Sequence, residues 1–163
     1  MHESPVTDLL QPRFETHQPM LLAGLVERYN TQNTSGIPDQ WRRFGPMIPQ
    51  ISGRAGNAAY GAVYNFQDND FDYLCAVEID RTTGADQVAD TLKTLTIPAS
   101  KYVVFRHGGH IADIQSFCTT IWTRWFPESG HTPLDAPMLE RYGPEFDPTT
   151  GTGGFEIWIA IEG

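Results

Sequence analysis

The order of strand and helix patterns in this chain repeats once, and this repeat is the strongest constraint on its fold. In the first half, an apolar run at residues 20–26 predicts a buried strand, and polar residues 30–36 predict a turn. Two strand-like runs, at 60–66 and 71–79, close the half and are separated by a polar hairpin turn at 67–70. Between the turn and the hairpin, apolar residues recur at helical spacing: Ile37, Trp41, Phe44 and Ile48.

The second half shows the same order of patterns. Residues 101–106 predict a strand, and the Gly-rich residues 107–110 predict a turn. A helix is expected over 111–125, with Pro127 just beyond its end. Two further strands are expected at 137–142 and 155–162, joined through a flexible hairpin connection at 147–154.

The closing strands of the two halves also match in register. Residues 71–78 can be laid over 155–162 so that Phe, an acidic residue, Ala and Glu fall at equivalent places. We therefore predict an α+β fold of two βαββ units related by a pseudo-twofold axis, with approximate boundaries 13–80 and 96–163. Their antiparallel sheets are expected to meet edge to edge, with the helices on one face and a ligand groove on the other. Residues 1–12 are expected to form an N-terminal tail.

Composition and charge restrict the kind of partner. The 163 residues are 40% apolar and 19% charged, which suits one globular domain with a full core. The net charge of −9 and the lack of a basic stripe argue against direct nucleic-acid binding. No run approaches the roughly 18 apolar residues of a membrane span, and no secretory signal is evident. With only two cysteines, Cys75 and Cys118, we expect reduced thiols in a cytoplasmic protein.

Strand alternation suggests which side chains line the groove. On the last strand, the isoleucines at 157, 159 and 161 are expected to face the helices, so Glu156 and Trp158 face the groove. On the preceding strand, Glu140 and Tyr142 share one side. If these strands form a hairpin, both acids could approach one aromatic-lined cavity. The alternative for Glu140 is an exposed position paired with Arg141.

Aromatic residues complete the expected site. A carboxylate ringed by aromatic faces favours a large delocalised cation, through ion pairing and cation–π contact. The alternative is that these aromatics serve the core, which we expect for Trp41, Phe44 and Trp125. The residues expected in the wall of the cavity are Tyr60, Tyr64, Trp122, Tyr142 and Trp158, with Phe105 behind them.

We expect neither a metal nor a cofactor. His107 and His110 lie in a Gly turn without a nearby third ligand, and a turn that caps the second helix explains the glycines better. No phosphate-binding loop and no GxSxG nucleophile motif occurs. Cys118 lies on the apolar helix face, which indicates a structural thiol.

Several segments, in order along almost the whole chain, carry a resemblance to a known family. They are Leu-Ala-Gly-Leu at 22–25, Trp-Arg-Arg-Phe at 41–44, Tyr-Leu-Cys-Ala-Val-Glu at 73–78, Ile-Pro-Ala at 97–99, Tyr-Val-Val-Phe-Arg-His at 102–107, Ile-Trp-Thr-Arg-Trp at 121–125, Leu-Glu-Arg-Tyr at 139–142 and Phe-Glu-Ile-Trp-Ile-Ala-Ile at 155–161. Together they resemble the GyrI-like domain, the effector-binding domain of AraC- and MerR-type multidrug regulators. This resemblance implies the double βαββ fold, a central ligand cleft, and Glu140 at the strand position where multidrug-binding members carry a pocket glutamate. About a dozen residues precede the domain, so we expect a free-standing domain without a helix-turn-helix module.

Three functions remain open at this point. The leading hypothesis is a binding module for small amphipathic, cationic molecules. The resemblance also allows a hydrolase that opens the cyclopropane of genotoxic natural products, with Glu140 and Glu156 as the acids. The third hypothesis is a gyrase-inhibitor-like domain whose acidic surface binds a protein partner, either gyrase or a regulator.

Overall fold

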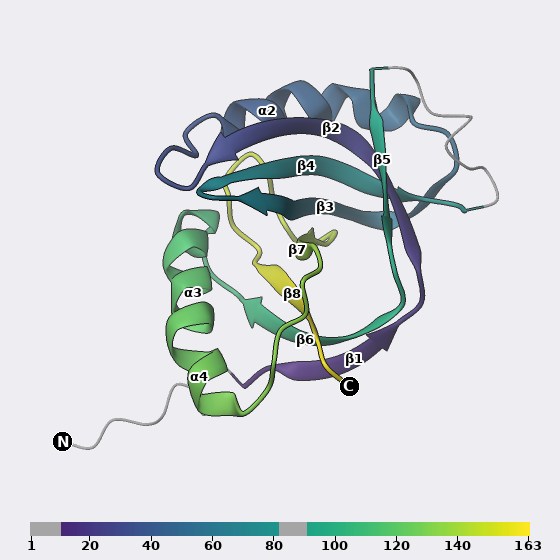
Figure 1. Cartoon of the computed structure of the whole chain (residues 1–163). Coiled ribbons are helices and arrows are strands. Elements are labelled where there is room, and N and C mark those ends of the chain that lie inside the picture. The colour runs from purple at the N-terminus through teal and green to yellow at the C-terminus, as the bar shows by residue number, and fades with distance from the viewer. Residues whose placement is uncertain (1–10, 82–90) are drawn as a thin grey trace.

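In the computed structural model, which describes residues 11–81 and 91–163, eight antiparallel strands form one curled sheet in the order β1-β6-β8-β7-β3-β4-β2-β5 (Figure 1). The fold is mixed α+β, as predicted. No helix in the described part of the chain is long and apolar enough to cross a membrane. The strands are β1 Arg13–His17, β2 Met20–Asn30, β3 Arg54–Gln67, β4 Asp70–Ile79, β5 Lys93–Ile97, β6 Ser100–His107, β7 Met138–Tyr142 and β8 Phe155–Ile161.

The strand order contains the predicted repeat. The first βαββ unit contributes the neighbours β2-β4-β3, and the second contributes β6-β8-β7, in the same relative order. The two units meet edge to edge where β3 pairs antiparallel with β7. This β3–β7 seam, in which Gly61 is opposite Glu140, lies at the centre of the sheet.

Two short strands were not predicted, and they tie the units together. β1 directly precedes β2 in sequence but pairs with β6 in the other unit. Correspondingly, β5 directly precedes β6 but pairs with β2. Each crossing occurs at a proline, Pro19 before β2 and Pro98 before β6. Because proline has no backbone N–H to donate, it marks the point where the chain leaves one pairing and begins the other.

The first helix, α2 (Ile37–Phe44), begins with Pro38 in its first turn and continues as a 3₁₀ helix over Gly45–Gln50, where Pro46 and Pro49 lie. The buried amide of Gln40 holds α2 on the sheet. Its Nε2 donates to the carbonyls of Leu25 (2.8 Å) and Tyr73 (2.9 Å), while its Oε1 accepts from the Tyr29 hydroxyl (2.7 Å). These three bonds fix the turn of α2 that carries Trp41.

The second helical region is longer than expected. A 3₁₀ turn (Ile111–Asp113), α3 (Ile114–Thr120), a π turn (Ile121–Trp125) and α4 (Phe126–Ser129) follow one another directly. Pro127 therefore lies in the first turn of α4, and its placement beyond the helix was wrong. The π turn explains the difference: Phe126 donates to the Ile121 carbonyl five residues back, and α4 restarts where a missing N–H is tolerated.

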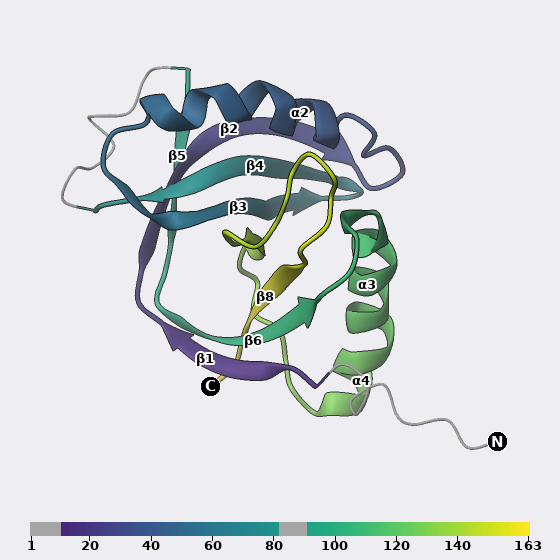
Figure 2. The same ribbon diagram turned by 180° about the vertical axis from the view of Figure 1, so that it is seen from behind.

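Both helical regions cover the same face of the sheet, which is called the helix face below (Figures 1 and 2). Its buried side chains form two clusters, around Phe44 and Tyr73 under α2 and around Phe105 and Trp125 under α3 and α4. The opposite face is also buried, because the sheet curls around a third cluster that includes Tyr60, Tyr102 and Trp158. Every residue of β8 is therefore buried.

β2 and β4 lie so close together at Gly24 that a substitution there can test their spacing. A Cβ at this position would lie 1.7 Å from the Cys75 carbonyl oxygen and 2.7 Å from the Ala76 Cα, both of which are backbone atoms. We expect Gly24→Ala to lower the free energy of unfolding by about 3 kcal/mol, at the upper end for overpacking. Gly45→Ala is the control, because Gly45 is helical and nothing lies within 4 Å of its Cβ position. Urea unfolding should leave that variant unchanged or slightly more stable. Equal effects of the two substitutions would contradict the close approach.

Candidate functional site

The β3–β7 seam places an acidic side chain inside the protein. Glu140 is directly opposite Gly61 of β3 and Ile157 of β8, so it shares the helix face with Ile157. The residue is 8% exposed. A carboxylate removed from water to this extent needs partners, so its contacts define the site.

Two tyrosine hydroxyls donate to the same oxygen of Glu140. Tyr73 of β4 lies 2.5 Å from Oε1, and Tyr142 of β7 lies 2.8 Å from it. The indole Nε1 of Trp41 in turn donates to the Tyr73 hydroxyl at 3.0 Å. The hydrogen bonds thus form a chain from the Trp41 indole, which can only donate, to the Tyr73 hydroxyl and from this hydroxyl to Glu140.

Gly61 makes room for this arrangement. A Cβ at position 61 would lie 2.3 Å from the Tyr73 hydroxyl and 2.6 Å from Glu140 Oε1. Any larger residue here would push the hydroxyl and the carboxylate apart. The close contact at the β3–β7 seam therefore explains why residue 61 is a glycine, which the neighbouring residues Tyr60 and Ala62 do not indicate.

Aromatic rings surround the carboxylate and its hydrogen bonds. The ring centroid of Trp41 lies 5.5 Å from that of Tyr142 and 6.4 Å from that of Tyr73, both nearly edge-on. Phe146 packs against Tyr142 at 4.8 Å. Trp41 is half-buried, and it contacts both tyrosines from α2. We call these five residues, Trp41, Tyr73, Glu140, Tyr142 and Phe146, the Glu140 cluster.

Burial raises the pKa of Glu140, and the hydrogen bonds from Tyr73 and Tyr142 only partly oppose this effect. In the described residues, no Lys, Arg or His forms an ion pair with Glu140. Hydroxyl donors stabilise a carboxylate less than a cation does. The site therefore contains an acid whose charge nothing nearby neutralises.

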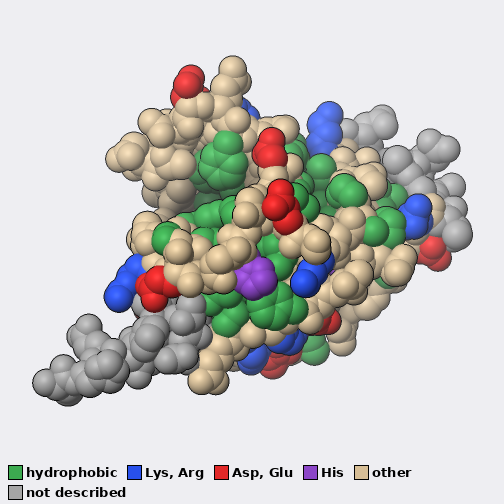
Figure 3. Space-filling model, turned by 60° about the horizontal axis from the view of Figure 1, so that its bottom comes forward, with side chains coloured by type: hydrophobic (Ala, Val, Ile, Leu, Met, Phe, Trp, Pro, Cys, Tyr) green, Lys and Arg blue, Asp and Glu red, His purple; other side chains and the backbone are tan. Residues whose placement is uncertain are grey.

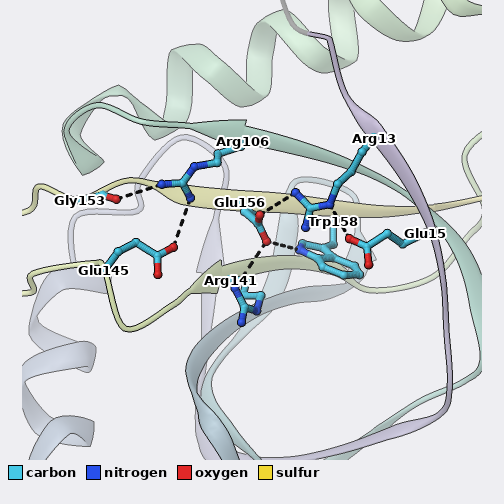
Figure 4. Close-up of polar contacts among 8 residues, drawn as sticks. All are labelled: Arg13, Glu15, Arg106, Arg141, Glu145, Gly153, Glu156 and Trp158. Carbon is cyan, nitrogen blue, oxygen red and sulfur yellow. Dashed lines mark hydrogen bonds and ion pairs between the residues drawn. The ribbon is translucent and has the colours of Figure 1, made fainter.

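The second acid, Glu156, has a different environment (Figure 4). Its Oε2 accepts from Arg13 at 2.8 Å, and its Oε1 accepts from the Trp158 indole at 3.1 Å and lies 3.6 Å from Arg141. Burial alone would raise the pKa of Glu156, but the hydrogen bonds from Arg13 and Trp158 and the charges of both arginines outweigh it and lower the pKa. Glu156 is thus an ionised acid paired with Arg13 and Arg141, and its pair with Arg13 ties β1 to β8.

The structure does not bring the two acids into one cavity. Glu156 is opposite Arg141, and Leu139 is opposite Trp158, so the face that Glu156 and Trp158 share is the one turned away from the helices. Glu140 is one residue out of step with them and lies on the helix face. The expectation that both acids approach one cavity was therefore wrong, because a difference of one residue in register puts the two acids on opposite faces of the sheet.

The aromatic residues expected in the wall of the cavity are also divided between the two faces of the sheet. Tyr142 lies in the Glu140 cluster, while Tyr60, Tyr64 and Trp158 lie on the opposite face. Phe105 is on the helix face but packs against Trp125 at 4.9 Å, beneath the second helical region. Trp122 is 40% exposed and stacks on Phe126. Of the expected wall, only Tyr142 contacts Glu140 directly.

A hollow that is open to solvent lies away from Glu140. It has a volume of about 410 Å³ and includes Tyr64. Tyr64 packs against the cluster opposite the helix face, so this hollow and Glu140 are separated by the sheet. The other residues that line it are Val26, Glu27, Arg28, Asp72, Lys93, Thr94 and Leu95. The Glu140 cluster is closed, with Trp41 between α2 and the tyrosines.

Two members of the cluster, Tyr73 and Phe146, were not singled out from the sequence. Trp41 was expected in helix–sheet packing, where it does lie, but its contact with the tyrosines was not predicted. The internal repeat offered a clue for Tyr73, since it falls where the matching strand has Ile157. A hydroxyl on a buried face needs a partner, which pointed to a polar group nearby.

The two histidines of the Gly turn have structural partners. His110 Nδ1 accepts from the Ala112 N–H and caps the start of the helix, and its Nε2 lies 2.9 Å from the Thr150 carbonyl. His107 stacks on Phe117 at 4.8 Å and lies 3.2 Å from Asp113. These contacts agree with a capping turn.

Glu140 should give the protein a measurable dependence of stability on pH. Because its pKa in the folded state is raised above its ordinary value of 4.5, the folded state favours the protonated acid. Its contribution to stability is complete below the ordinary pKa and is lost as the pH rises toward the folded-state pKa, by up to about 1.4 kcal/mol per pH unit. We expect the stability of Glu140→Gln relative to wild type to increase over this range in urea unfolding series. A difference that stays constant with pH would show that Glu140 is ionised as readily as in the unfolded chain.

The sequence and the fold of this chain are similar to those of known proteins. The chain is 24% identical to the transcriptional regulator BrlR of Pseudomonas aeruginosa PAO1 over 138 residues, which is 83% of this chain and 50% of that protein. The chain therefore spans about half the length of this curated relative.

Solved structures share the fold. The structure of SAV2435 bound to tetraphenylphosphonium has a TM-score of 0.74 at 20% identity, with 93% of this chain and 94% of that chain covered. The C-terminal domain of EcmrR has a TM-score of 0.65 at 15% identity, covering 93% and 97%. A hydrolase encoded by lin2189 of Listeria innocua is more distant, with a TM-score of 0.55 at 9% identity and coverage of 93% and 91%. The model of the GyrI-like small molecule binding domain matches residues 10–162, so the chain belongs to this family.

Proposed function

We propose that this domain binds lipophilic organic cations and that Glu140 is the carboxylate that meets their positive charge. The observation that carries the proposal is the Glu140 cluster: a carboxylate that is 8% exposed, aromatic rings around it, and no basic partner within the described residues. A ligand with a delocalised positive charge and an apolar surface would supply the positive partner that Glu140 lacks and would pack against the aromatic rings.

The physical reason is that pairing between the carboxylate and the cation offsets the cost of removing each charge from water. An ionised carboxylate is expensive to hold away from water unless it is paired. A lipophilic cation carries a weakly hydrated charge, gains cation–π contact with the rings, and pairs with the acid. The net charge of −9 also favours the approach of cations over anions.

Access to the carboxylate requires a local change. Gln40 holds the backbone of α2 by its three hydrogen bonds, whereas the Trp41 side chain is held by one hydrogen bond, to Tyr73. Rotation of the Trp41 side chain is therefore a smaller change than displacement of the helix. We propose that this indole moves when a ligand enters.

The relatives support the proposal at the level of the family. SAV2435 has been solved with tetraphenylphosphonium, a lipophilic cation, and BrlR is a transcriptional regulator. We propose that this domain likewise serves as a ligand-sensing module for transcription regulation in the cytoplasm, whether alone or with other protein segments.

The hydrolase alternative is less favoured by the geometry. It relied on Glu140 and Glu156 acting on one substrate, but these acids lie on opposite faces of the sheet, and Glu156 is paired with Arg13. No contact in the described structure favours a gyrase partner. Binding without chemistry is the function that the site supports best.

Isothermal titration calorimetry with three phenyl-substituted probes that differ in charge tests the proposal. Tetraphenylphosphonium is the cation, tetraphenylborate is the matched anion, and triphenylphosphine oxide is a neutral aromatic analogue. We expect the cation to bind and the anion to fail, because only the cation can pair with Glu140. Glu140→Gln should weaken the cation about 30-fold, which corresponds to about 2 kcal/mol.

The control variant is Glu156→Gln, which removes the other buried acid from the opposite face. It should retain the affinity of wild type within about threefold, provided that circular dichroism shows it to be folded. A second control is Glu128→Gln at an exposed position. The proposal is wrong if Glu140→Gln binds the cation as tightly as wild type, or if the borate binds as tightly as the phosphonium.

A further inference from the structure

The Glu140 cluster has a consequence for how binding depends on protons. We propose that Glu140 is protonated in the empty domain and that each organic cation displaces this proton, so that binding exchanges one cation for one H⁺. This inference rests on the proposed function, because it concerns the same site. It adds that the affinity of the domain is set by pH as well as by the ligand.

The hydrogen bonds leave one oxygen for a proton. Both tyrosine hydroxyls, of Tyr73 and of Tyr142, donate to Oε1. Within the described residues, no hydrogen bond to Oε2 is found. A neutral acid has one carbonyl oxygen that accepts and one oxygen that bears hydrogen. The geometry fits Oε1 in the first role and Oε2 in the second.

Glu156 provides an internal comparison. It is buried to a similar extent, 6% exposed against 8% for Glu140, but two arginine side chains and an indole N–H face its carboxylate. Glu140 has hydroxyl donors only. The same chain therefore contains one buried acid that two arginine side chains keep charged and one that pairs with no cation in the described residues.

No other group near Glu140 is available for the exchange at neutral pH. Tyr73 and Cys75 face it from β4, Tyr142 from β7 and Cys118 from α3, while α2 contributes Trp41 and β3 contributes Gly61, neither of which titrates. Burial raises the pKa of both tyrosines and of Cys75, and it raises the pKa of Cys118 to about 12. All four remain neutral, and burial also raises the pKa of Glu140 itself.

The exchange conserves charge at the site. The O–H bond at Oε2 breaks, the proton passes to solvent buffer, and the carboxylate that remains pairs with the incoming cation. The interior is thus neutral before and after binding, and at no stage is an unpaired charge buried. It follows that affinity should rise about tenfold per pH unit while the empty acid is protonated, and then level off above its pKa.

Calorimetry measures the released proton directly. Tetraphenylphosphonium is titrated into wild-type protein in phosphate and in Tris, whose heats of protonation differ, at several pH values between about 5 and 8. We expect release of about one proton per cation at the lower pH values and less toward the upper end. Triphenylphosphine oxide, which is neutral, should release none, and Glu156→Gln should release the same number as wild type.

The empty state is tested without any ligand. Carbon-13 NMR of the glutamate side-chain carboxyl groups should show one resonance that remains protonated well above the ordinary pKa of 4.5 and is missing in Glu140→Gln. This measurement decides the first half of the inference even if Glu140→Gln binds too weakly for calorimetry. A Glu140 resonance that titrates at or below 4.5 would overturn it.

The outcomes separate the inference from the proposed function. Tight cation binding with no proton release and no dependence on pH would overturn the exchange and leave the function standing. Equal proton release by wild type and Glu140→Gln would also overturn it, since the proton would come from another group. Failure of the phosphonium to bind at any pH would remove the proposed function and the exchange together.

Discussion

The hydrogen bonds that converge on Glu140 are the interaction on which the arrangement of the two halves depends. Glu140 lies on the edge strand of the second unit, and Trp41 and Tyr73 come from the first. Polar groups buried at an interface are costly unless they form hydrogen bonds with each other. These hydrogen bonds therefore specify how β3 and β7 pair more strictly than apolar packing alone would. The absence of a side chain at Gly61 permits the approach. The two crossing strands, β1 and β5, then hold the units together at the outer edges of the sheet.

The two buried acids show how one fold can use the same residue type in opposite ways. Glu156 lies between Arg13 and Arg141 and serves structure, since its ion pair fastens the crossing strand β1 to β8 (Figure 4). In that strand, the Phe14 ring lies between the His131 ring, whose centroid is 5.0 Å away, and the Lys101 ammonium at 5.6 Å. These contacts fix β1 further. Figure 3 shows a histidine among hydrophobic side chains on the side of the molecule that is at the bottom of Figure 1. Glu140 has no such ion pair among the described residues, and its part in joining the two units requires an oxygen that accepts from Tyr73 and Tyr142 but does not require a charge.

The sequence was sufficient for the plan of the fold and insufficient for the site. The internal repeat predicted the order of elements, the edge-to-edge sheets and the common side of the helices, because these follow from hydrophobic periodicity over long segments. It did not predict β1, whose residues Arg13–His17 alternate without a clear apolar face and pair with a strand far along the chain. It placed Glu140 on the wrong face because that depends on a one-residue register, and it overlooked Tyr73 because only the tertiary contact reveals a partner for its hydroxyl.

A buried acid without a cation is a cost that the fold alone does not explain. Glutamine at position 140 could accept hydrogen bonds from the same two hydroxyls, and it would not have to take up a proton to avoid the several kcal/mol that an ion costs in a protein interior. The remaining site is not strained, since Gln40 secures α2 independently and every hydroxyl in the cluster is satisfied. Stability therefore gives no reason for a carboxylate here. Acids whose pKa is shifted by burial are typical of functional sites. The acid is best explained by a state of the protein in which a positive charge lies beside it.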